Sequence, residues 1–381
     1  MRRYKVGILG TGVISRTYLA DIRAFYRPLE VVACADLLQE RAQTLAKEFS
    51  VPRACTVEEL LQSQDIDIIV NLTPPQAHVE IDRKILEAGK HLFSEKPFAP
   101  TLAQAKDLLE LATRKGVQVG CAPDTFLASG LQSMRYYLDA GLIGKPFFVT
   151  ANMTSAGVES WHPNPAPFYQ QGAGPVMDMA PYYLSAIVSL LGPIQSIAAF
   201  STQRSAERCI YVGPQAGGSV PVNTPTHYSA ILRLCSGVVV NLTLSFDVYR
   251  SNLPMLEVYG DAGTLTYPDP NYGGGKPKVY RKEQFLNTIY RKDAQQDSER
   301  FFELPEVFTQ VKAYSRGIGV LDLASAIDGG MPCRTGGDLL LHITEALEGL
   351  QLAAQQGSLY RMTTTCARPR PLTPGGPPDQ V

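Results

Sequence analysis

The first 120 residues alternate between short apolar segments and segments with helical periodicity, and this alternation limits the possible folds more than any other feature. Residues 4–9, 29–35, 65–72 (DIDIIVNL) and 117–122 (VQVGCA) have the length and apolar character of buried strands. Nearly continuous apolar strands that alternate with helices are typical of a parallel, doubly wound sheet. The helices expected between them run from Ser15 towards Phe25, from Leu38 to Phe49, from Thr56, from Val79 to Ala88, and from Thr101 to about Lys115.

The character of the sequence changes after Pro123. Two helices are expected, near residues 130–140 and 338–355, and between them apolar and polar residues alternate. Alternation of this kind predicts a largely antiparallel sheet with one buried face. The strand candidates are PFFVTANMT, IQSIAAFST, HYSAILRLCS, VVVNLTLSF and MLEVYG.

The composition argues against several classes of protein. A chain of 381 residues is long enough for two domains. A formal net charge of −1 gives no reason to expect nucleic acid or an anionic membrane as a partner, and no apolar run reaches the roughly 18 residues of a membrane span. The seven cysteines form no Cys-x-x-Cys motif and the five histidines show no metal-ligating spacing. We therefore expect a cytoplasmic protein with reduced thiols, no metal and no signal peptide.

A glycine-containing turn joins the first strand to the first helix. In GILGTGVIS, Gly10 can form the tight turn, Gly12 can let the backbone approach a pyrophosphate at the helix N-terminus, and Ser15 is small enough to pack there. Asp36 follows the second strand, where a carboxylate can hold the ribose hydroxyls of NAD and repel a 2′-phosphate; alternatively, it caps the next helix. NAD is therefore favoured. Arg41 is near enough to contact a 2′-phosphate, so NADP is not excluded. The turn residues expected to bind the cofactor are Gly10, Thr11, Gly12, Val13 and Ile14.

Four segments together resemble the Gfo/Idh/MocA oxidoreductase family, which includes glucose–fructose oxidoreductase and inositol dehydrogenase. They are the glycine turn, NLTPPQAH at 71–78, EKP at 95–97 and GAGPVMDMAPYYL at 172–184, and the resemblance extends to about residue 357. It implies an N-terminal Rossmann domain and a C-terminal α/β domain with a large, mostly antiparallel open sheet that commonly serves as an oligomer interface. We therefore expect a homodimer or homotetramer. The expected division is an NAD-binding domain at 1–122, a substrate and oligomerisation domain at 123–357, and a tail at 358–381 that is largely disordered at its proline- and glycine-rich end.

The resemblance also implies site residues. Lys96 matches the family's catalytic lysine, and Glu95 and Pro97 frame it, the proline often following a cis peptide bond. Asp178 fits the second motif, whereas Tyr182 stands where the family has the histidine expected to act as acid or base. The residues expected to line the cofactor are Leu72, Thr73, Pro74, His78, Glu95 and Lys96.

The chemistry expected of these residues follows from alcohol oxidation, which requires a hydride acceptor, a base for the hydroxyl proton and a cation near the developing alkoxide. Lys96 can be that cation or relay the proton. A neighbouring ammonium favours ionisation of a phenol, so Tyr182 can serve as the base, with Asp178 orienting it or accepting the proton itself. The structural alternatives are a solvated surface lysine at 96 and a core aromatic at 182.

Two further segments are candidates for substrate binding. ESWHPNPAPFYQQ at 159–171 contains the only tryptophan, and a sugar pocket needs an aromatic surface and fixed hydrogen-bonding groups, which Trp161, His162 and Asn164 can supply. A rigid packing loop is the alternative. In CAPDTF at 121–126, Asp124 and Thr125 follow a strand end and can reach substrate hydroxyls.

The sequence therefore predicts an NAD-dependent dehydrogenase or reductase that acts on a secondary alcohol or carbonyl of a sugar, cyclitol or related polyol. Two alternatives remain open. One is an enzyme that cleaves glycosides with NAD as an internal redox relay. The other is a non-catalytic protein that senses NAD or NADP, for which the absence of the family's histidine is an argument.

Overall fold

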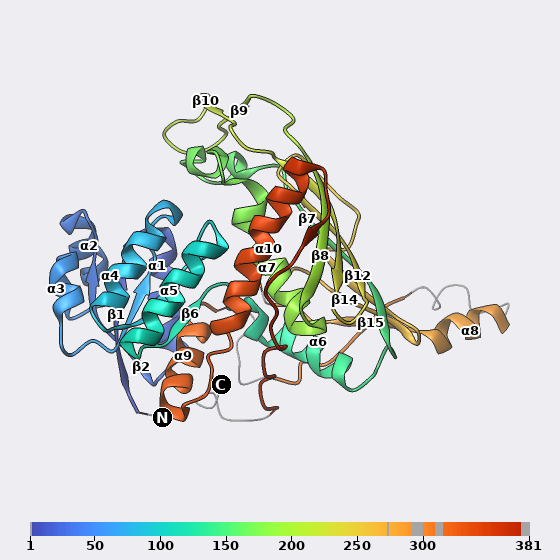
Figure 1. Cartoon of the computed structure of the whole chain (residues 1–381), viewed down its shortest axis with the longest axis horizontal. Coiled ribbons are helices and arrows are strands. Elements are labelled where there is room, and N and C mark those ends of the chain that lie inside the picture. Colours follow the sequence, from blue (N-terminus) through green and yellow to red (C-terminus); the bar gives the residue numbers. More distant parts are fainter. Residues whose placement is uncertain (1, 273, 291–299, 309–314, 375–381) are drawn as a thin grey trace. The chain divides into compact units, whose positions relative to one another are not determined.

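The computed structural model describes residues 2–272, 274–290, 300–308 and 315–374 (Figure 1). These residues divide into two compact units. The first comprises residues within 1–128, 308–344 and 369–381, and the second comprises 129–307 and 345–368. Among the described helices, none combines the length and the apolar character needed to cross a membrane.

The first unit contains a six-stranded parallel sheet in the order β3-β2-β1-β4-β5-β6. This order is that of a Rossmann fold, and the switch point between β1 and β4 is where such sheets bind ligands. The expected doubly wound parallel sheet is confirmed. Its strands are β1 (Tyr4–Leu9), β2 (Leu29–Ala35), β3 (Arg53–Cys55), β4 (Ile68–Asn71), β5 (His91–Ser94) and β6 (Val119–Cys121).

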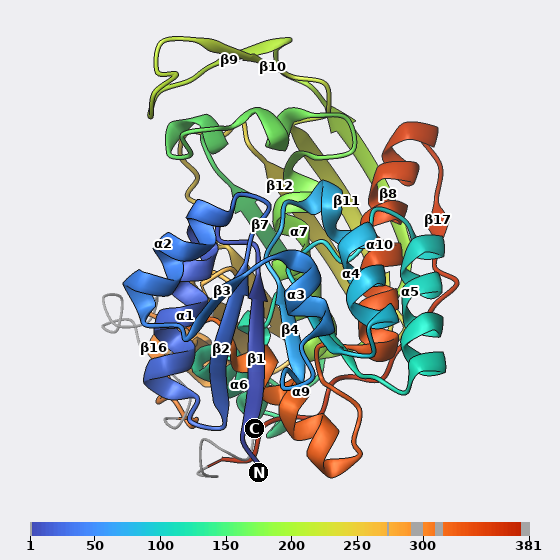
Figure 2. The same cartoon turned by 90° about the vertical axis from the view of Figure 1, so that its left-hand side faces the viewer.

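Helices cover both faces of this sheet (Figure 2). Helices α1 (Val13–Phe25) and α2 (Gln39–Phe49) pack together and against β2, whereas α4 (His78–Glu87) packs against β4, β5 and α5 (Leu102–Lys115). The short helix α3 (Val57–Gln62), which follows Thr56 as expected, begins with a capping box, in which the Thr56 hydroxyl and the Glu59 carboxylate each accept a backbone N–H. The helices bury an apolar core against the strands, which includes Ile69, Leu86 and Leu108.

Phe308 and residues 315–344 belong to the first unit, although the sequence led us to expect them in the second domain. Helix α9 (Ile318–Gly329) contacts β5 and β6, and its Gly319 lies so close to Phe93 that an added Cβ would be 2.6 Å from the ring. Leu340, in the first turn of α10 (Gly337–Gln356), joins the same core. The contacts of this segment are distant in sequence, which is why local patterns did not place it.

The second unit contains a nine-stranded sheet in the order β16-β15-β14-β13-β7-β12-β11-β8-β17. Only the β7–β12 pair is parallel among the paired strands described, so the expected large, mostly antiparallel sheet is confirmed. A separate hairpin consists of β9 (Glu207–Cys209) and β10 (Ser219–Pro221). The nine strands are β7 (Pro146–Thr154), β8 (Ile194–Thr202), β11 (His227–Leu234), β12 (Val239–Ser245), β13 (Leu256–Gly260), β14 (Gly263–Tyr267), β15 (Lys278–Arg281), β16 (Phe302–Glu303) and β17 (Tyr360–Arg361).

One face of this large sheet is covered by helices. Helix α7 (Gly174–Leu191) packs against β7, β11 and β12, and α6 (Ser129–Asp139) packs against β14 (Figure 1). The alternation in β11 shows the consequence, because Tyr228, Ala230, Leu232 and Leu234 are buried while the intervening side chains face the other side. That other face carries exposed apolar residues among polar ones, including Phe200 and Ile231. The remaining described helix is α8 (Lys282–Tyr290).

From Glu345, within α10, to Arg368 the chain belongs to the second unit. Strand β17 pairs with β8, and the buried Glu345 carboxylate accepts hydrogen bonds from the N–H and hydroxyl groups of Thr363 and Thr364. The structure describes residues 358–374 of the predicted tail. The predicted disorder at the end of the tail falls on residues 375–381, which lie outside the described residues.

Candidate active site

The glycine turn after β1 has a backbone that only glycine accommodates well. Gly10 has φ +96°, and a Cβ added there would lie 2.7 Å from the carbonyl carbon and oxygen of Leu72. Gly12 caps the N-terminus of α1, and a Cβ added there would meet nothing within 4 Å. The buried Ser15 hydroxyl donates to the Gly12 carbonyl at 2.7 Å. The turn therefore leaves open space beside the helix N-terminus, where an anionic group is favoured.

Asp36, at the end of β2, is joined to this turn. One carboxylate oxygen accepts hydrogen bonds from the N–H and the hydroxyl of Thr11, both at 2.8 Å, and the other accepts from the N–H of Leu38 at 3.0 Å. Partial burial opposes ionisation, but these hydrogen bonds outweigh it and lower the pKa of Asp36. Leu38, not Asp36, is the N-cap of α2, so the geometry favours a carboxylate that serves the turn over one that caps a helix.

Two exposed apolar residues stand next to Asp36 and to the glycine turn in the chain. Leu37 is 93% exposed and Val13 is 79% exposed, which is unusual for such residues in a loop and a first helical turn. Together with the turn and Asp36 they fit NAD, since an adenine ring needs apolar cover, a pyrophosphate needs backbone N–H groups, and ribose hydroxyls need an acceptor. Leu37 was not among the cofactor-binding residues that we predicted from the sequence. The pattern that could have indicated it is the pair Leu37 and Leu38 directly after Asp36, which follows a buried strand.

The end of β4 forms a hydrogen-bonded turn. The Asn71 side-chain oxygen accepts from the N–H and hydroxyl of Thr73 at 3.1 and 2.7 Å, and its amide donates to Asp82 at 2.7 Å. Leu72 is buried, Pro74 is exposed, and Thr73 is half-buried. Thr73 and Pro74 are therefore accessible at the carboxyl edge of the sheet, as a cofactor-lining segment requires.

His78 is buried, and its ring is hydrogen-bonded within the protein, which gives the predicted cofactor contact no support. Its side chain is 1% exposed, with Nδ1 2.8 Å from the Pro97 carbonyl oxygen and Nε2 2.8 Å from the Thr73 carbonyl oxygen. A neutral imidazole can donate to one of these oxygens and an imidazolium to both. The ring thus connects the segment after β4 to the segment after β5 and acts as a support beneath the site.

Lys96 follows the carboxyl end of β5 and is half-buried. Glu95, 8% exposed, accepts a hydrogen bond from the Tyr18 hydroxyl at 2.9 Å and another from the backbone N–H of Lys96 at 3.0 Å. The Lys96–Pro97 peptide bond is cis, as the resemblance implied. The Glu95 carboxylate thus holds the backbone that carries Lys96, which is a positioning role.

Asp124 is not available to substrate, contrary to our prediction. It is fully buried, one carboxylate oxygen accepts from the N–H groups of Gly317 and Gly319 at 3.1 and 2.9 Å, and the other lies 3.7 Å from Arg316. Its role is to hold the start of α9. Thr125, which begins the 3₁₀ turn Thr125–Leu127, is also buried, at 4% exposure, so its geometry gives no support to the predicted substrate contact.

The other predicted residues lie in the second unit. Asp178 and Tyr182 are four residues apart in α7, so they share one helix face; Asp178 is half-buried and Tyr182 is 5% exposed. In the loop, the His162 ring lies 5.3 Å from that of Trp161, and its Nδ1 accepts from the Asn164 N–H at 3.1 Å. The structure therefore brings these three loop residues together. Arg41, in the first unit, is exposed.

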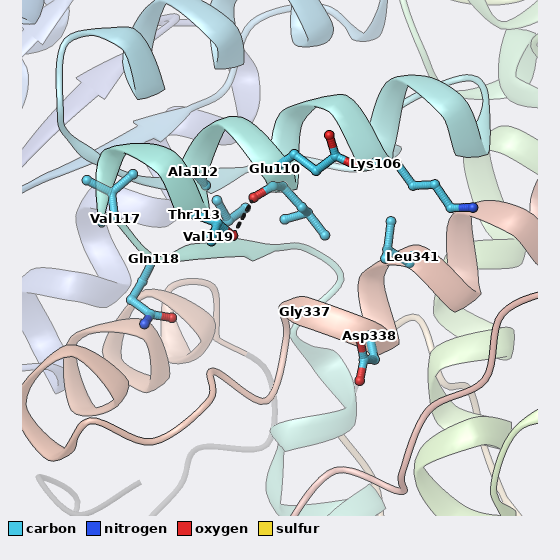
Figure 3. A pocket seen from close by; sticks show the side chains of 12 residues that line it. Lys106, Glu110, Ala112, Thr113, Val117, Gln118, Val119, Gly337, Asp338 and Leu341 are labelled. Carbon is cyan, nitrogen blue, oxygen red and sulfur yellow. Dashed lines mark hydrogen bonds between the residues drawn. The ribbon is translucent and has the colours of Figure 1, made fainter.

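A separate groove of about 820 Å³ lies between α5 and the first turn of α10 (Figure 3). Val119, in its lining, is the first residue of β6, so the groove lies at the amino edge of the parallel sheet. Lys96 and the glycine turn lie at the carboxyl edge, where open α/β sheets bind their ligands. The groove is therefore not the candidate active site.

Comparison with protein families decides the relationship. Residues 4–122 match the family described as "Oxidoreductase family, NAD-binding Rossmann fold", and residues 131–266 match the C-terminal domain of the same family. The chain belongs to the Gfo/Idh/MocA oxidoreductase family. The earlier resemblance is confirmed over both domains, and the Gfo/Idh/MocA assignment makes the glycine turn of residues 10–15 part of an NAD-binding domain.

Several relatives within the Gfo/Idh/MocA family are similar over part of the chain. An uncharacterised oxidoreductase of Schizosaccharomyces pombe is 28% identical over 58% of this chain and 63% of its own length. Inositol 2-dehydrogenase/D-chiro-inositol 3-dehydrogenase of Lacticaseibacillus casei is 31% identical over 42% of this chain and 47% of its own length. The chain thus spans about half to two thirds of these relatives.

Solved structures show the same fold over nearly the whole chain. Levoglucosan dehydrogenase in complex with NADH and levoglucosan has a TM-score of 0.77 at 18% identity and covers 95% of this chain and 100% of its own. Aldose–aldose oxidoreductase from Caulobacter crescentus, in complex with glycerol, has a TM-score of 0.75 at 19% identity, with 95% and 100% covered. At these identities the similarity establishes the two-domain architecture alone.

Proposed function

We propose that this protein is an NAD-dependent dehydrogenase or reductase that acts on a secondary alcohol or carbonyl group of a sugar, cyclitol or related polyol. The observation that carries the proposal is the set of groups at the carboxyl edge of the parallel sheet. There the open turn at Gly12, the ionised Asp36 and the buttressed Lys96 all follow strands of one sheet. The relatives that act on inositol and levoglucosan support the substrate class.

In this proposal residues 1–122 hold the cofactor and residues 123–357 supply most of the substrate pocket. The turn of residues 10–14, Asp36 and the exposed Leu37 would hold the dinucleotide, with Thr73 and Pro74 beside it. When bound, NAD supplies the hydride acceptor or, reduced, the hydride donor. NAD is favoured over NADP because the Asp36 carboxylate is ionised and would repel a 2′-phosphate.

Lys96 is the proposed electrostatic catalyst. Its ammonium would stabilise the alkoxide that develops as the hydroxyl loses its proton, an interaction that strengthens towards the transition state. Glu95 and His78 hold the backbone on both sides of it, so the side chain starts from a fixed position. Asp178 and Tyr182, on one face of α7, are the proposed proton acceptors, with the tyrosine in the place of the family's histidine.

Turnover with external cofactor tests this proposal against its alternatives. Purified protein is mixed with NAD or NADP and a panel of sugars, cyclitols and sugar acids, and the absorbance of reduced nicotinamide is followed. We expect net NADH with at least one polyol and a lower rate with NADP. A reduced nicotinamide that stays bound while a glycoside is cleaved would favour the internal relay, and tight NAD binding without reduction across the panel would favour the sensor.

We also propose that the protein is a homodimer or homotetramer in the cytoplasm. The uncovered face of the large sheet carries Phe200 and Ile231, which are 74% and 55% exposed, and a second copy would remove them from water. The cysteines in the described part of the chain are thiols, which suits a reducing compartment.

A further inference from the structure

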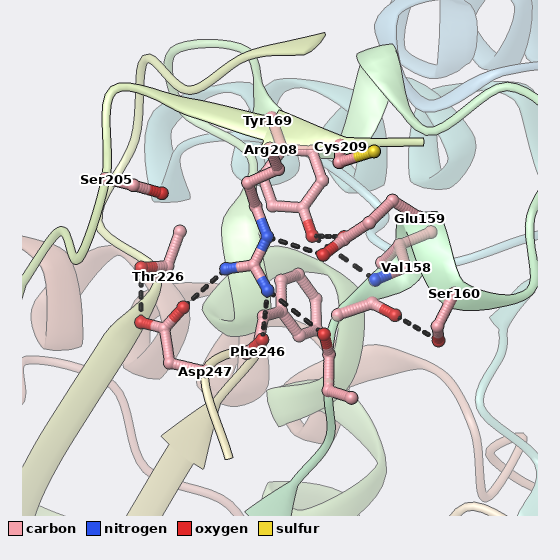
Figure 4. A network of polar contacts seen from close by, with 12 residues as sticks. Val158, Glu159, Ser160, Tyr169, Ser205, Arg208, Cys209, Thr226, Phe246 and Asp247 are labelled. Atoms are coloured by element: carbon pink, nitrogen blue, oxygen red, sulfur yellow. Dashed lines mark hydrogen bonds and ion pairs between the residues drawn. The ribbon is translucent and has the colours of Figure 1, made fainter. Parts of the chain in front are cut away.

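A buried arginine in the β9–β10 hairpin connects three segments of the second unit. The guanidinium of Arg208 donates from Nε to Glu159 at 2.6 Å and from Nη2 to the carbonyl oxygens of Ala156 and Phe246 at 3.0 and 2.8 Å (Figure 4). Its Nη1 pairs with Asp247. Arginine has five N–H donors in a rigid fork, and here four contacts extend in three directions. The hairpin is thereby fastened to the loop after β7 and to the end of β12.

This network fixes both ends of the loop that carries Trp161. The second carboxylate oxygen of Glu159 accepts a hydrogen bond from the hydroxyl of the buried Tyr169, and that hydroxyl in turn accepts from the Val158 N–H at 3.2 Å. The Glu159 carbonyl accepts from Tyr211 N–H in the hairpin at 3.1 Å. Residues 158 and 169 are thus tied to each other and to the hairpin through one ion pair.

The close packing extends to the residue before this loop. Gly157 has φ +103°, and a Cβ there would lie 2.6 Å from Arg208 Nη2 and 2.5 Å from the Glu159 carboxylate. Only glycine leaves room for the ion pair in this position. Asp247 is held in its turn by the Thr226 hydroxyl at 2.6 Å. The close packing and the Thr226 hydrogen bond therefore restrict the network to one geometry.

The backbone of the candidate substrate residues is hydrogen-bonded to Val158, which belongs to this network. The backbone N–H groups of Trp161 and His162 both donate to the Val158 carbonyl, at 3.1 and 2.9 Å. The His162 ring lies 5.1 Å from that of Phe168, next to Tyr169 in the chain. Trp161 is 62% exposed and His162 half-buried, so these side chains present a surface while the backbone beneath them is fixed.

We propose that Arg208 is a positioning residue for the substrate pocket: through Glu159 and Tyr169 it fixes the loop that presents Trp161 and His162, without touching substrate itself. The part that concerns substrate rests on the proposed polyol dehydrogenase activity. The part that concerns the loop rests only on the network. A large ordered loop that carries an aromatic surface needs such support, because exposed loops otherwise pay an ordering cost when ligand binds.

The test compares Arg208→Lys with the matched control Arg204→Lys. Lysine keeps the charge but has three donors on one atom, which cannot reach both carboxylates and both carbonyl oxygens. Arg204 lies just before the same hairpin and is exposed, and its guanidinium donates to the Tyr249 hydroxyl at 3.3 Å. Because Trp161 is the only tryptophan, the time-resolved anisotropy of its fluorescence reports the order of the loop without any need for activity.

Arg208→Lys should increase the fast depolarisation of Trp161, and Arg204→Lys should leave it unchanged. For a polyol identified in the substrate screen, Arg208→Lys should raise KM by about ten- to a hundredfold, the equivalent of one charged hydrogen bond, with kcat and NAD affinity within about threefold. Glu159→Gln, which keeps the side-chain shape, should change both readouts in the same direction and serves if Arg208→Lys does not fold.

Unchanged Trp161 anisotropy in both Arg208→Lys and Glu159→Gln would overturn the proposal. So would equal losses in NAD affinity and polyol KM, because they would mean a general loss of structure. If no polyol is turned over while the anisotropy changes as expected, the proposed activity fails and the positioning of the loop stands.

Discussion

Replacing Asp82 with asparagine should make the stability of the protein less dependent on pH. Asp82 is fully buried in α4 beneath the candidate site, and its carboxylate accepts a hydrogen bond from the Asn71 amide at 2.7 Å. Burial raises its pKa from 3.8 to about 6, and the Asn71 hydrogen bond only partly opposes this rise. The folded chain therefore holds the Asp82 proton to higher pH than the unfolded chain.

The sign and size of the effect follow from proton linkage. Between pH 3.8 and about 6 the folded state binds more protons than the unfolded state, so the free energy of unfolding falls as pH rises. This rise in pKa corresponds to a loss of about 3 kcal/mol in the free energy of unfolding, and the loss is complete above about pH 7. Asparagine does not titrate and keeps an oxygen for the Asn71 amide. The stability of Asp82→Asn relative to the wild type should therefore increase by up to about 3 kcal/mol between pH 4 and pH 7.5.

Urea denaturation of both proteins, followed by circular dichroism at several pH values, measures this difference. Asp65→Asn is the control, because hydrogen bonds from Ser63 and Arg53 lower the pKa of the exposed Asp65 to about 2. Its effect should have the opposite sign and be small, since solvent screens exposed ion pairs. A stability difference between Asp82→Asn and the wild type that stays constant from pH 4 to pH 7.5 would refute the reasoning.

Three further predictions concern the cofactor, the proton acceptor and the assembly. Asp36→Ala should weaken NAD binding about ten- to a hundredfold and narrow its preference over NADP, and calorimetric titration that gave unchanged affinity would contradict the assigned carboxylate role. Tyr182→Phe should slow turnover, and its effect should be less than additive with that of Lys96→Met if both serve one proton path; fully additive losses in steady-state kinetics would argue against it. Light scattering should show a dimer or tetramer that Ile231→Asp dissociates, whereas a wild-type monomer at micromolar concentration would exclude the proposed interface.

The local pattern of the sequence was sufficient to predict the parallel sheet. The strands at 4–9 and 29–35 match their predicted bounds, and the helices expected from Thr56 and Thr101 follow these residues, whose side chains each accept a backbone N–H at the helix N-terminus. Each of these signals depends on a few neighbouring residues. Strand β3 was missed because it has only three residues and none of them is strongly apolar. The β9–β10 hairpin was missed because each of its two strands has only three residues.

Sequence reasoning located the site residues that directly follow a strand, because a local pattern marks the strand end. The glycine turn, Asp36 and Lys96 lie where the strand ends placed them. Asp124 was assigned to substrate because its partners, Gly317 and Gly319, are almost two hundred residues away and no local pattern reveals them. Arg208 gave no signal either, since an arginine in a short polar strand is ordinarily exposed.

Single-turnover kinetics of Lys96→Met tests the central claim most directly. Methionine keeps much of the side-chain length and removes the charge, and Lys106→Met is the control because Lys106 is exposed on α5 at the groove away from the carboxyl edge. With a polyol identified in the screen, the rate of NADH formation should fall by about 10²–10³ in Lys96→Met, comparable to the loss of one preorganised charge-stabilising group. NAD affinity and the unfolding temperature should stay close to those of the wild type, and Lys106→Met should match the wild type throughout. A Lys96→Met protein that binds NAD normally and reduces it at the wild-type rate would contradict the account.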